Sequence, residues 1–380
     1  MKEQFLQLIW KLKLFNHSSL KLLDGRSLII KDYGIFNAIE SGPDFLNAMI
    51  KLEKLTWSGN IEIHLKSSDW YRHKHHSDPA YNNVILHVVW ENDCTIDING
   101  WEIPVLELKN RVDVSLLQKF SILQQSMATF PCQRLISKVD SIFMRQMMDS
   151  SLLSRLERKT KELIDLDPYQ LIYVLLSKAI GGKVNQFAFE YMSQYLPYSF
   201  VEQMSVPQRK MTFASLNGLN LNYSETNSQL FFGFKRKGMR PSSFPEKRLI
   251  QLSNLVSLIP VLFDLLELTV EEFIFQFRKR VNQLDASITY DLQNLLLING
   301  IVPFLFVYGM NSESASLQEK AITILQLLPP EKNNIVLKMR KLGFVVNNSF
   351  DSQAILEIYN EFCSKKKCMN CVVGMKIINS

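Results

Sequence analysis

Two patterns of hydrophobic spacing divide the chain. Up to residue 110, short apolar runs alternate with polar residues or stand between turn residues, as in β-strands. After Lys109, apolar residues recur every three or four positions, as on the buried face of a helix. The pattern predicts an α+β protein in which a small mixed-sheet domain over residues 1–110 precedes a large helical domain over residues 111–380.

The first domain is expected to begin with an amphipathic helix, because apolar residues from Phe5 to Phe15 fall at helical spacing. A hairpin is predicted around Asn99-Gly100, a dipeptide that favours a type I′ turn. A short helix starting near Trp70 can be capped by Ser67, Ser68 or Asp69. Strands are predicted over residues 26–36, 45–52, 60–66, 84–90, 95–98 and 101–106.

The second domain is predicted to be helical almost throughout, without a convincing internal repeat. Gly181-Gly182 and Pro329-Pro330 interrupt the helical pattern. Helices are expected over residues 112–123, 142–166, 168–180, 187–196, 248–268, 270–281, 289–297 and 319–328.

Composition and charge leave a wide range of functions open. The 380 residues are 47% hydrophobic and 21% charged, as in ordinary globular proteins. A formal net charge of +6 permits an acidic partner such as nucleic acid without demanding one. The N-terminus lacks the apolar core of a secretory signal, and the longest mainly apolar stretch, Leu255–Leu268, is too short to span a bilayer. We therefore expect a cytoplasmic protein with no membrane partner.

The candidate chemistry lies in the first domain, where five of the six histidines fall between positions 64 and 87. In the strand predicted over residues 60–66, alternation places Glu62, His64 and Lys66 on one face. Asp44 stands directly before the neighbouring strand. Carboxylates on adjacent strands can converge on Mg²⁺ or Mn²⁺, which polarises a phosphodiester and lowers the pKa of a bound water. His64 or Lys66 can then orient that water or stabilise charge on phosphate.

The order of these elements resembles the core of the PD-(D/E)XK nucleases, which include restriction endonucleases and lambda-type exonucleases. Pro43-Asp44 before one strand and Glu62-Ile63-His64 on the next carry the resemblance. It implies that Asp44 and Glu62 bind a divalent metal, with the Ile63 carbonyl as a third ligand. Where the family usually has Lys, this chain has His64, and imidazole favours softer ions than Mg²⁺. The rival interpretation is a turn and an exposed strand face.

The whole chain also resembles a large bacterial family of unknown function. The matching segments are GPDF (42–45), GNIEIHLKSSDW (59–70), DPAYNNVILHVVWEND (78–93), FKRKGMRPSSFPEKRLIQL (234–252) and the C-terminal cysteine cluster. This resemblance covers nearly all 380 residues and implies no particular activity.

Further histidines follow in the helix predicted from Trp70. Asp69, His73 and His76 are three or four positions apart, so a helix would place them on one face. They would then flank the metal or contact phosphate, or else form a solvated surface. His87 lies in an apolar strand and is expected to be a core histidine rather than a ligand.

Four of the five cysteines form a second candidate site. Cys363, Cys368 and Cys371 have the spacing C-x4-C-x2-C, and Cys132 is the candidate fourth ligand for Zn²⁺ or an iron–sulphur cluster. Some helicase-associated PD-(D/E)XK exonucleases resemble this layout and hold a [4Fe–4S] cluster, although their spacing differs and their lone cysteine precedes the nuclease core. Reduced thiols that only pack are the alternative, and Cys94 is expected to be a small hydrophobe at a strand end.

A basic segment in the helical domain carries several phenylalanines. Such a mixture suits a nucleic-acid path, through phosphate neutralisation and base stacking. A solvated loop with packed phenylalanines is the alternative. The basic residues are Lys235, Arg236, Lys237, Arg240, Lys247 and Arg248.

These residues favour a metal-dependent nuclease, or a nuclease-like DNA-processing protein, with Mg²⁺ or Mn²⁺ as cofactor and nucleic acid, most simply DNA, as partner. Two alternatives stay open. The chain can be a non-catalytic nucleic-acid-binding or assembly module on an inherited scaffold, or a metallohydrolase that acts on another ester through its histidines.

Overall fold

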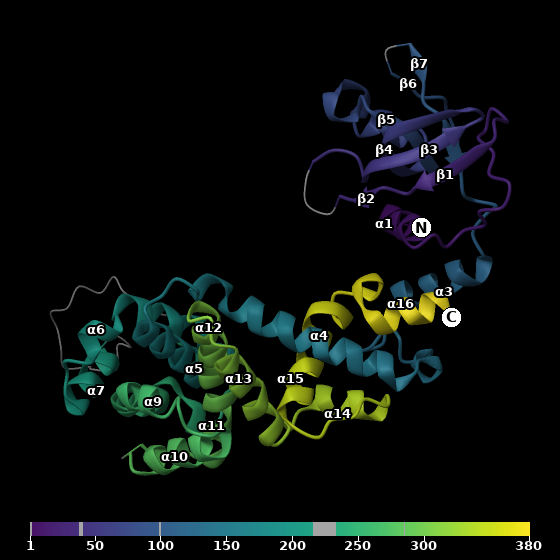
Figure 1. Ribbon diagram of the computed structural model, residues 1–380. Coiled ribbons are helices and arrows are strands. Elements are labelled where there is room, and N and C mark those ends of the chain that lie inside the picture. The colour runs from purple at the N-terminus through teal and green to yellow at the C-terminus, as the bar shows by residue number, and fades with distance from the viewer. Residues whose placement is uncertain (1, 38–40, 99, 216–232, 285) are drawn as a thin grey trace. The chain divides into compact units, whose positions relative to one another are not determined.

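The computed structural model describes residues 2–37, 41–98, 100–215, 233–284 and 286–380. Within these ranges the chain has the expected α+β fold, with a mixed sheet near the N-terminus followed by helices (Figure 1). Asn99, at the centre of the predicted hairpin turn, lies outside the described residues.

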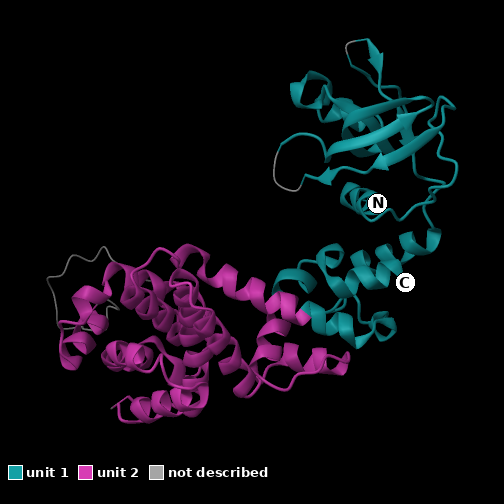
Figure 2. Ribbon diagram, in the orientation of Figure 1, with its two compact units in different colours: residues 1–147, 359–380 teal, residues 148–358 magenta. Residues whose placement is uncertain are grey.

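The chain divides into two compact units, shown in Figure 2. Unit 1 contains residues 1–147 and 359–380, and unit 2 contains residues 148–358. This division differs from the predicted boundary at residue 110, because the next helix returns to the N-terminal residues. Helix α3 (Val114–Gln125) carries Phe120, whose ring stacks on Phe5 with centroids 3.7 Å apart. It also packs against the C-terminal helix α16 (Val372–Asn379).

The main sheet of unit 1 has six strands in the order β1-β3-β4-β5-β8, and β2 pairs with the same edge of β3 as β1. Pairing is antiparallel from β1 to β4 and parallel from β4 to β8, so the sheet is mixed as expected. The strands are β1 (Leu28–Asp32), β2 (Ile35–Phe36), β3 (Phe45–Leu52), β4 (Leu55–Lys66), β5 (Val84–Glu91) and β8 (Val105–Glu107).

The predicted strands over 45–52 and 84–90 agree closely with β3 and β5. Strand β4 begins five residues earlier than expected, because a tight turn after Leu52 pairs that residue with Leu55. The predicted strand over 101–106 is divided. Strand β7 (Trp101–Glu102) pairs with β6 (Asp97–Ile98), and after Pro104 the chain joins the main sheet as β8.

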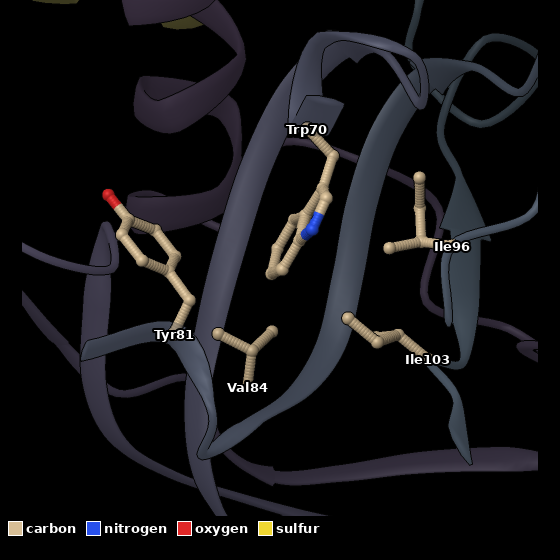
Figure 3. Packing of buried hydrophobic residues seen from close by; sticks show 5 residues of the cluster. All are labelled: Trp70, Tyr81, Val84, Ile96 and Ile103. Carbon is tan, nitrogen blue, oxygen red and sulfur yellow. The ribbon is translucent and has the colours of Figure 1, made fainter. Parts of the chain in front are cut away.

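The short helix predicted near Trp70 is present as α2 (Asp69–Arg72), but it ends after one turn. Lys74 then adopts a left-handed backbone with φ 64°, and 3₁₀ turns follow at His75–Ser77 and Pro79–Tyr81. Figure 3 shows how Trp70 anchors this region, packed among Tyr81, Val84, Ile96 and Ile103. The loop is therefore fixed against the sheet by apolar contacts.

Helix α1 (Glu3–Lys11) supplies further cover for the sheet and packs against β4. Its buried face holds Phe5, Leu6, Ile9 and Trp10, at the helical spacing seen in the sequence. Polar side chains of α1 that border this buried face lie beside the start of β3, where the candidate site is found.

The described residues of unit 2 form helices and connecting loops, without a strand, as expected. The predicted interruption at Gly181-Gly182 is confirmed, because Gly182 takes the non-helical angles φ 58° and ψ −172° and separates the two helical halves of α5. The helices from α4 onward are α4 (Ser141–Thr160), α5 (Pro168–Tyr195), α6 (Tyr198–Val201), α7 (Val206–Ser215), α8 (Pro245–Leu255), α9 (Ile259–Asp264), α10 (Val270–Asn282), α11 (Tyr290–Leu296), α12 (Val302–Asn311), α13 (Ala315–Leu327), α14 (Asn334–Lys341) and α15 (Ser349–Glu357).

Among the residues that the structure describes, one helical run, Tyr290–Asn311, is long and apolar enough to cross a membrane by length and composition. It joins α11 and α12 through a π-helical turn at Leu297–Ile301. Within its most apolar window, 83% of the run is buried inside the protein, as in the core helix of a soluble protein. The predicted stretch Leu255–Leu268 is also a buried helical region, formed by the end of α8, a 3₁₀ turn and α9.

Candidate functional site

Asp44 and Glu62, eighteen positions apart, meet at the junction of β3 and β4. The backbone N–H of Asp44 donates to Glu62 Oε2 at 3.0 Å, and the N–H of Ile63 donates to Asp44 Oδ2 at 3.1 Å. Each carboxylate is therefore fixed by the backbone of the other strand. Glu62 is only 5% exposed, and Asp44 is half-buried. The convergence expected from the strand order is present.

Burial and mutual repulsion change the acidity of this pair. Burial, together with the nearby charge of Glu62, raises the pKa of Asp44 to about 7. Burial also raises the pKa of Glu62 to about 8, with a smaller contribution from Glu3. A cation between these two carboxyl groups would favour their ionised forms and so offset the effect of burial and mutual repulsion.

Helix α1 contributes two residues that the sequence analysis missed. Gln7 donates through Nε2 to Asp44 Oδ1 at 2.8 Å. Glu3, one turn earlier, has its pKa raised by burial and by the charge of Asp44. Their four-residue spacing places both on one helical face, which is the signal that could have found them.

His64 lies at the centre of a chain of imidazoles. It is fully buried, with Nδ1 2.9 Å from His87 Nε2 and Nε2 3.2 Å from His73 Nδ1. Its Nε2 also lies 3.4 Å from Glu62 Oε1. Burial, followed by repulsion from the other histidines, lowers the pKa of His64 to about 2. His64 is therefore neutral at pH 7 and cannot act as a cation in place of Lys.

His75 completes the cluster from the loop after α2. Its Nε2 lies 3.3 Å from Glu62 Oε1, and its ring stacks on Tyr81 with centroids 3.8 Å apart. The left-handed Lys74 turns the loop so that His73 and His75 both approach His64. In the part of the chain that the structure describes, only His64, His73 and His75 form a group of three or more metal-ligating residues whose ligand atoms all lie within 4.8 Å of one another.

The predicted flank of Asp69, His73 and His76 is only partly brought to this site, because α2 ends at Arg72. Asp69 instead accepts from the backbone N–H of Lys66 at 3.2 Å and pairs with Arg72 at 2.9 Å. His76 is exposed and packs against Tyr71. His75, rather than the predicted His76, therefore lies beside the carboxylates.

Lys66 and Ile63 differ from the predicted arrangement in a second way. Lys66 is exposed, and its positive charge helps to lower the pKa of Asp93. Burial raises that pKa, but hydrogen bonds from Ser68 also lower it. Ile63 meets Asp44 through its N–H, while the metal role predicted for its carbonyl stays a prediction. His87 is fully buried, as expected of a core histidine, and supports His64 from behind.

The four cysteines predicted as one site all belong to unit 1. Cys368 and Cys371 lie close enough to Cys132 for their charges to affect its pKa, which burial raises to about 12. Burial and the other three cysteines also raise the pKa of Cys363. The fold therefore gathers these four thiols, whereas Cys94 packs against the Trp70 cluster, as expected of a small hydrophobe.

The basic segment lies in unit 2 and is less free than its sequence indicates. Arg236 forms an ion pair with Glu246, and half-buried Arg248 donates to Ser243 Oγ at 3.2 Å and to Gln251 Oε1 at 3.0 Å. The remaining basic side chains are exposed: Lys235, Lys237, Arg240 and Lys247.

Fold and site together define an α+β protein that holds a carboxylate and histidine cluster on a mixed sheet. The chain belongs to the family described as "Protein of unknown function (DUF2851)", which matches residues 3–220 and 217–334. No curated protein and no solved structure matches it. The expected family membership is thus confirmed, and the resemblance to nucleases stays a prediction. Cys363, Cys368 and Cys371 lie beyond the matched residues.

Proposed function

We propose that this protein is a metal-dependent phosphodiester hydrolase, a nuclease or nuclease-like DNA-processing protein, that acts at Asp44 and Glu62. The observation that carries the proposal is the meeting of these two carboxylates across β3 and β4, each bonded to the backbone of the other strand. Glu62 Oε1 also lies 3.3 Å from the Nε2 atom of His75. Such a mixed oxygen and nitrogen set is the chemistry of a catalytic divalent cation.

The residues of the site fit a cation on electrostatic grounds. Burial raises the pKa of Asp44 to about 7 and of Glu62 to about 8, so the pair is poorly compensated without positive charge. Mg²⁺ and Mn²⁺ favour carboxylate oxygen, and the imidazoles extend the fit to Zn²⁺. A divalent cation here supplies Lewis acidity toward a phosphodiester oxygen and acidifies a water.

The chain's own groups have distinct roles in this proposal. Asp44 and Glu62 hold the cation, and Gln7 orients Asp44 through its hydrogen bond. His64 is neutral, so it offers a lone pair or a neutral N–H rather than charge. His75 is the group proposed to accept a proton from an attacking water, because its Nε2 lies 3.3 Å from Glu62 Oε1, beside the proposed cation.

The tautomer of His64 follows from its neighbour. Among the described residues, His87 Nδ1 is buried without a hydrogen-bond partner. A buried unpaired acceptor is less costly than a buried unpaired N–H, so His87 carries its proton on Nε2 and donates it to His64 Nδ1. His64 then donates from Nε2 toward Glu62 Oε1, which fixes the carboxylate. His87 is a positioning residue, in the manner of a metal site's outer shell.

Nucleic acid is the proposed partner, most simply DNA. The exposed residues Lys235, Lys237, Arg240 and Lys247 supply positive charge for a phosphate backbone. Arg236 and Arg248 contribute less, since each already has a partner inside the protein. Binding through this segment should weaken as salt rises, because phosphate contacts release counterions.

A cleavage assay tests the proposed activity. Purified protein is incubated with labelled single- and double-stranded DNA and RNA, with Mg²⁺, Mn²⁺ or Zn²⁺ added to chelator-treated samples. We expect cleavage that needs a metal and is lost in Asp44→Asn. Glu53→Gln removes a carboxylate at the opposite end of β3 and should cut normally. If no substrate is cut with any of these metals, the nuclease proposal is wrong.

A second candidate, a metallohydrolase acting on another ester, is favoured by the three histidines whose ligand atoms lie within 4.8 Å of one another. Such a trio suits Zn²⁺. Hydrolysis of small phosphate or carboxylate esters with Zn²⁺, lost in His73→Ala and His75→Ala while nucleic acids stay intact, would favour it over the nuclease.

A cytoplasmic location is part of the proposal. All five cysteines are free, as is usual in a reducing compartment. Fractionation of cells that express the full chain tests it, and recovery from a membrane or exported fraction would contradict it.

A further inference from the structure

Four cysteines from two distant segments meet in unit 1, away from the carboxylate and histidine site. Cys132 follows α3. Cys363 ends the π-helical turn Ile358–Cys363, and Cys368 and Cys371 lie between that turn and α16. Helix α16 packs against both α3 and the 3₁₀ turn Ile136–Lys138, which begins just after Cys132. The carbonyl of Cys132 accepts from the N–H of Leu135 and Ile136, so its position is tied to that turn.

The C-terminal segment is shaped around its cysteines. Cys371 is the N-cap residue of α16, and the nearby backbone N–H groups of Val373 and Gly374 lower the pKa of its thiol against the effect of burial. A Cβ on Gly374 would stand 2.2 Å from the carbonyl oxygen of Cys368, so only glycine allows these turns to touch. Lys366 exchanges hydrogen bonds with Gln124 of α3, which fastens the segment to the rest of unit 1.

The spacing of the sulfurs distinguishes between kinds of metal centre. Zinc–sulfur bonds of about 2.3 Å in a tetrahedron bring every pair of sulfurs to about 3.8 Å. Among the described residues, no three cysteines meet the 4.8 Å spacing that the histidines satisfy. The four are nevertheless near enough for Cys132, Cys368 and Cys371 each to influence Cys363. Their sulfurs are therefore not at the spacing of a single-ion site, whereas the cysteines of an iron–sulphur cluster bind different iron atoms and can lie further apart.

We propose that Cys132, Cys363, Cys368 and Cys371 hold an iron–sulphur cluster that ties the C-terminal segment, residues 359–380, to the rest of unit 1. The backbone N–H groups of Val373 and Gly374 already lower the pKa of Cys371, so they would stabilise its thiolate as a ligand, and such groups tune these centres. The nearby Lys366 offsets negative charge on Cys368. Binding displaces the four thiol protons, because only thiolates act as ligands.

The test uses the full chain, purified without oxygen. Iron, acid-labile sulfide and zinc are measured per chain, and a visible absorption spectrum is recorded. We expect iron and sulfide in equal amounts and broad visible absorption. One zinc per chain without sulfide would overturn the proposal, and so would a metal-free protein whose thiols all react with an alkylating agent.

Two variants locate the cluster. Cys132→Ser should lose most of its iron and expose residues 359–380 to limited proteolysis, whereas Cys94→Ser, the matched control, should keep both unchanged. Full iron in Cys132→Ser would exclude it as a ligand and contradict the proposal. If Cys132→Ser does not fold, the iron and sulfide content of the unaltered protein still decides. Asp44→Asn should keep its iron, so this result is separate from the cleavage assay.

Discussion

The carboxylate and histidine site and the four-cysteine site lie in the same unit but are built in opposite ways. The first draws its histidines from one stretch, residues 64–87, and brings three ligand nitrogens within 4.8 Å. The second joins Cys132 to residues more than 200 positions later, at a wider spacing. The difference teaches that one compact unit can hold two donor sets, one of hard and borderline ligands for a single ion and one of soft sulfur.

The largest effect is expected on cleavage activity, which should depend on the carboxylate and histidine site and not on the four-cysteine site. Replacing Asp44 or Glu62 with its amide removes a charged ligand while keeping its shape. Such a ligand supports several kcal/mol of transition-state stabilisation, so cleavage should fall roughly 10³-fold or more. Rates of DNA cleavage measure this, with iron content measured in the same samples. Wild-type rates in both variants would show that the carboxylates are structural only.

Removing a histidine should have a smaller effect. His75→Ala deletes the imidazole 3.3 Å from Glu62 Oε1, and we expect affinity for Mn²⁺ or Zn²⁺ to fall about 10–100-fold. Titration calorimetry on chelator-treated protein measures it. His76→Ala is the matched control, because His76 is exposed beside Tyr71. If both variants lose the same metal affinity, the loss does not depend on the position of His75 in the cluster.

The raised pKa values of Asp44 and Glu62 predict a pH dependence over a range that the cysteine site does not share. Folding raises the pKa of Asp44 to about 7 and of Glu62 to about 8, so the folded protein binds more protons than the unfolded chain. Stability without divalent metal should therefore fall as pH rises from about 4 to the folded-state pKa values of about 7 and about 8, and then level off, by at most about 1.4 kcal/mol per pH unit for each group.

His64 and His87 act in the opposite direction and offset the carboxyl groups below about pH 6.5, since burial lowers their pKa values to about 2 and about 3. Their contribution is lost as pH falls below the ordinary histidine value. The net fall in stability should therefore be clearest between about pH 6.5 and 8. Thermal denaturation across this range, with and without Mn²⁺, checks the prediction. The decline should vanish in an Asp44→Asn, Glu62→Gln double variant, and a decline that persists there would have another origin.

The smallest effect is expected at Lys66. Because this side chain is exposed and its charge acts on Asp93, Lys66→Ala should change cleavage less than about tenfold. His64→Lys, which restores the residue usual in the resembled nucleases, tests the same position from the other side. If Lys66→Ala lowers cleavage as much as Asp44→Asn does, Lys66 takes part in the reaction.

Much of the fold follows from local spacing. Alternation placed Glu62 and His64 together on β4, and Pro43-Asp44 correctly marked the start of β3. Helical periodicity also located most helices of unit 2 from their apolar faces. These features depend on near neighbours along the chain, so the sequence alone can display them.

The histidine loop shows where this reasoning stops. A helix over residues 69–76 would have aligned Asp69, His73 and His76, but packing of Trp70 and the left-handed Lys74 turn the chain after one helical turn. Because of that turn, His75 and not His76 lies beside Glu62. Glu3 and Gln7 joined the site because α1 packs on β4, a contact that no local pattern reveals.

The sequence by itself determined the ligand types, the alternation that pairs Glu62 with His64, and the C-x4-C-x2-C spacing. Only the tertiary structure decided that Asp44 is bonded across to Glu62, that His75 faces the carboxylate, and that Cys132 meets cysteines near the C-terminus. The physical reason is that spacing along a chain sets direction over a few residues, whereas approach between distant segments and the burial that shifts their pKa values depend on how whole elements pack.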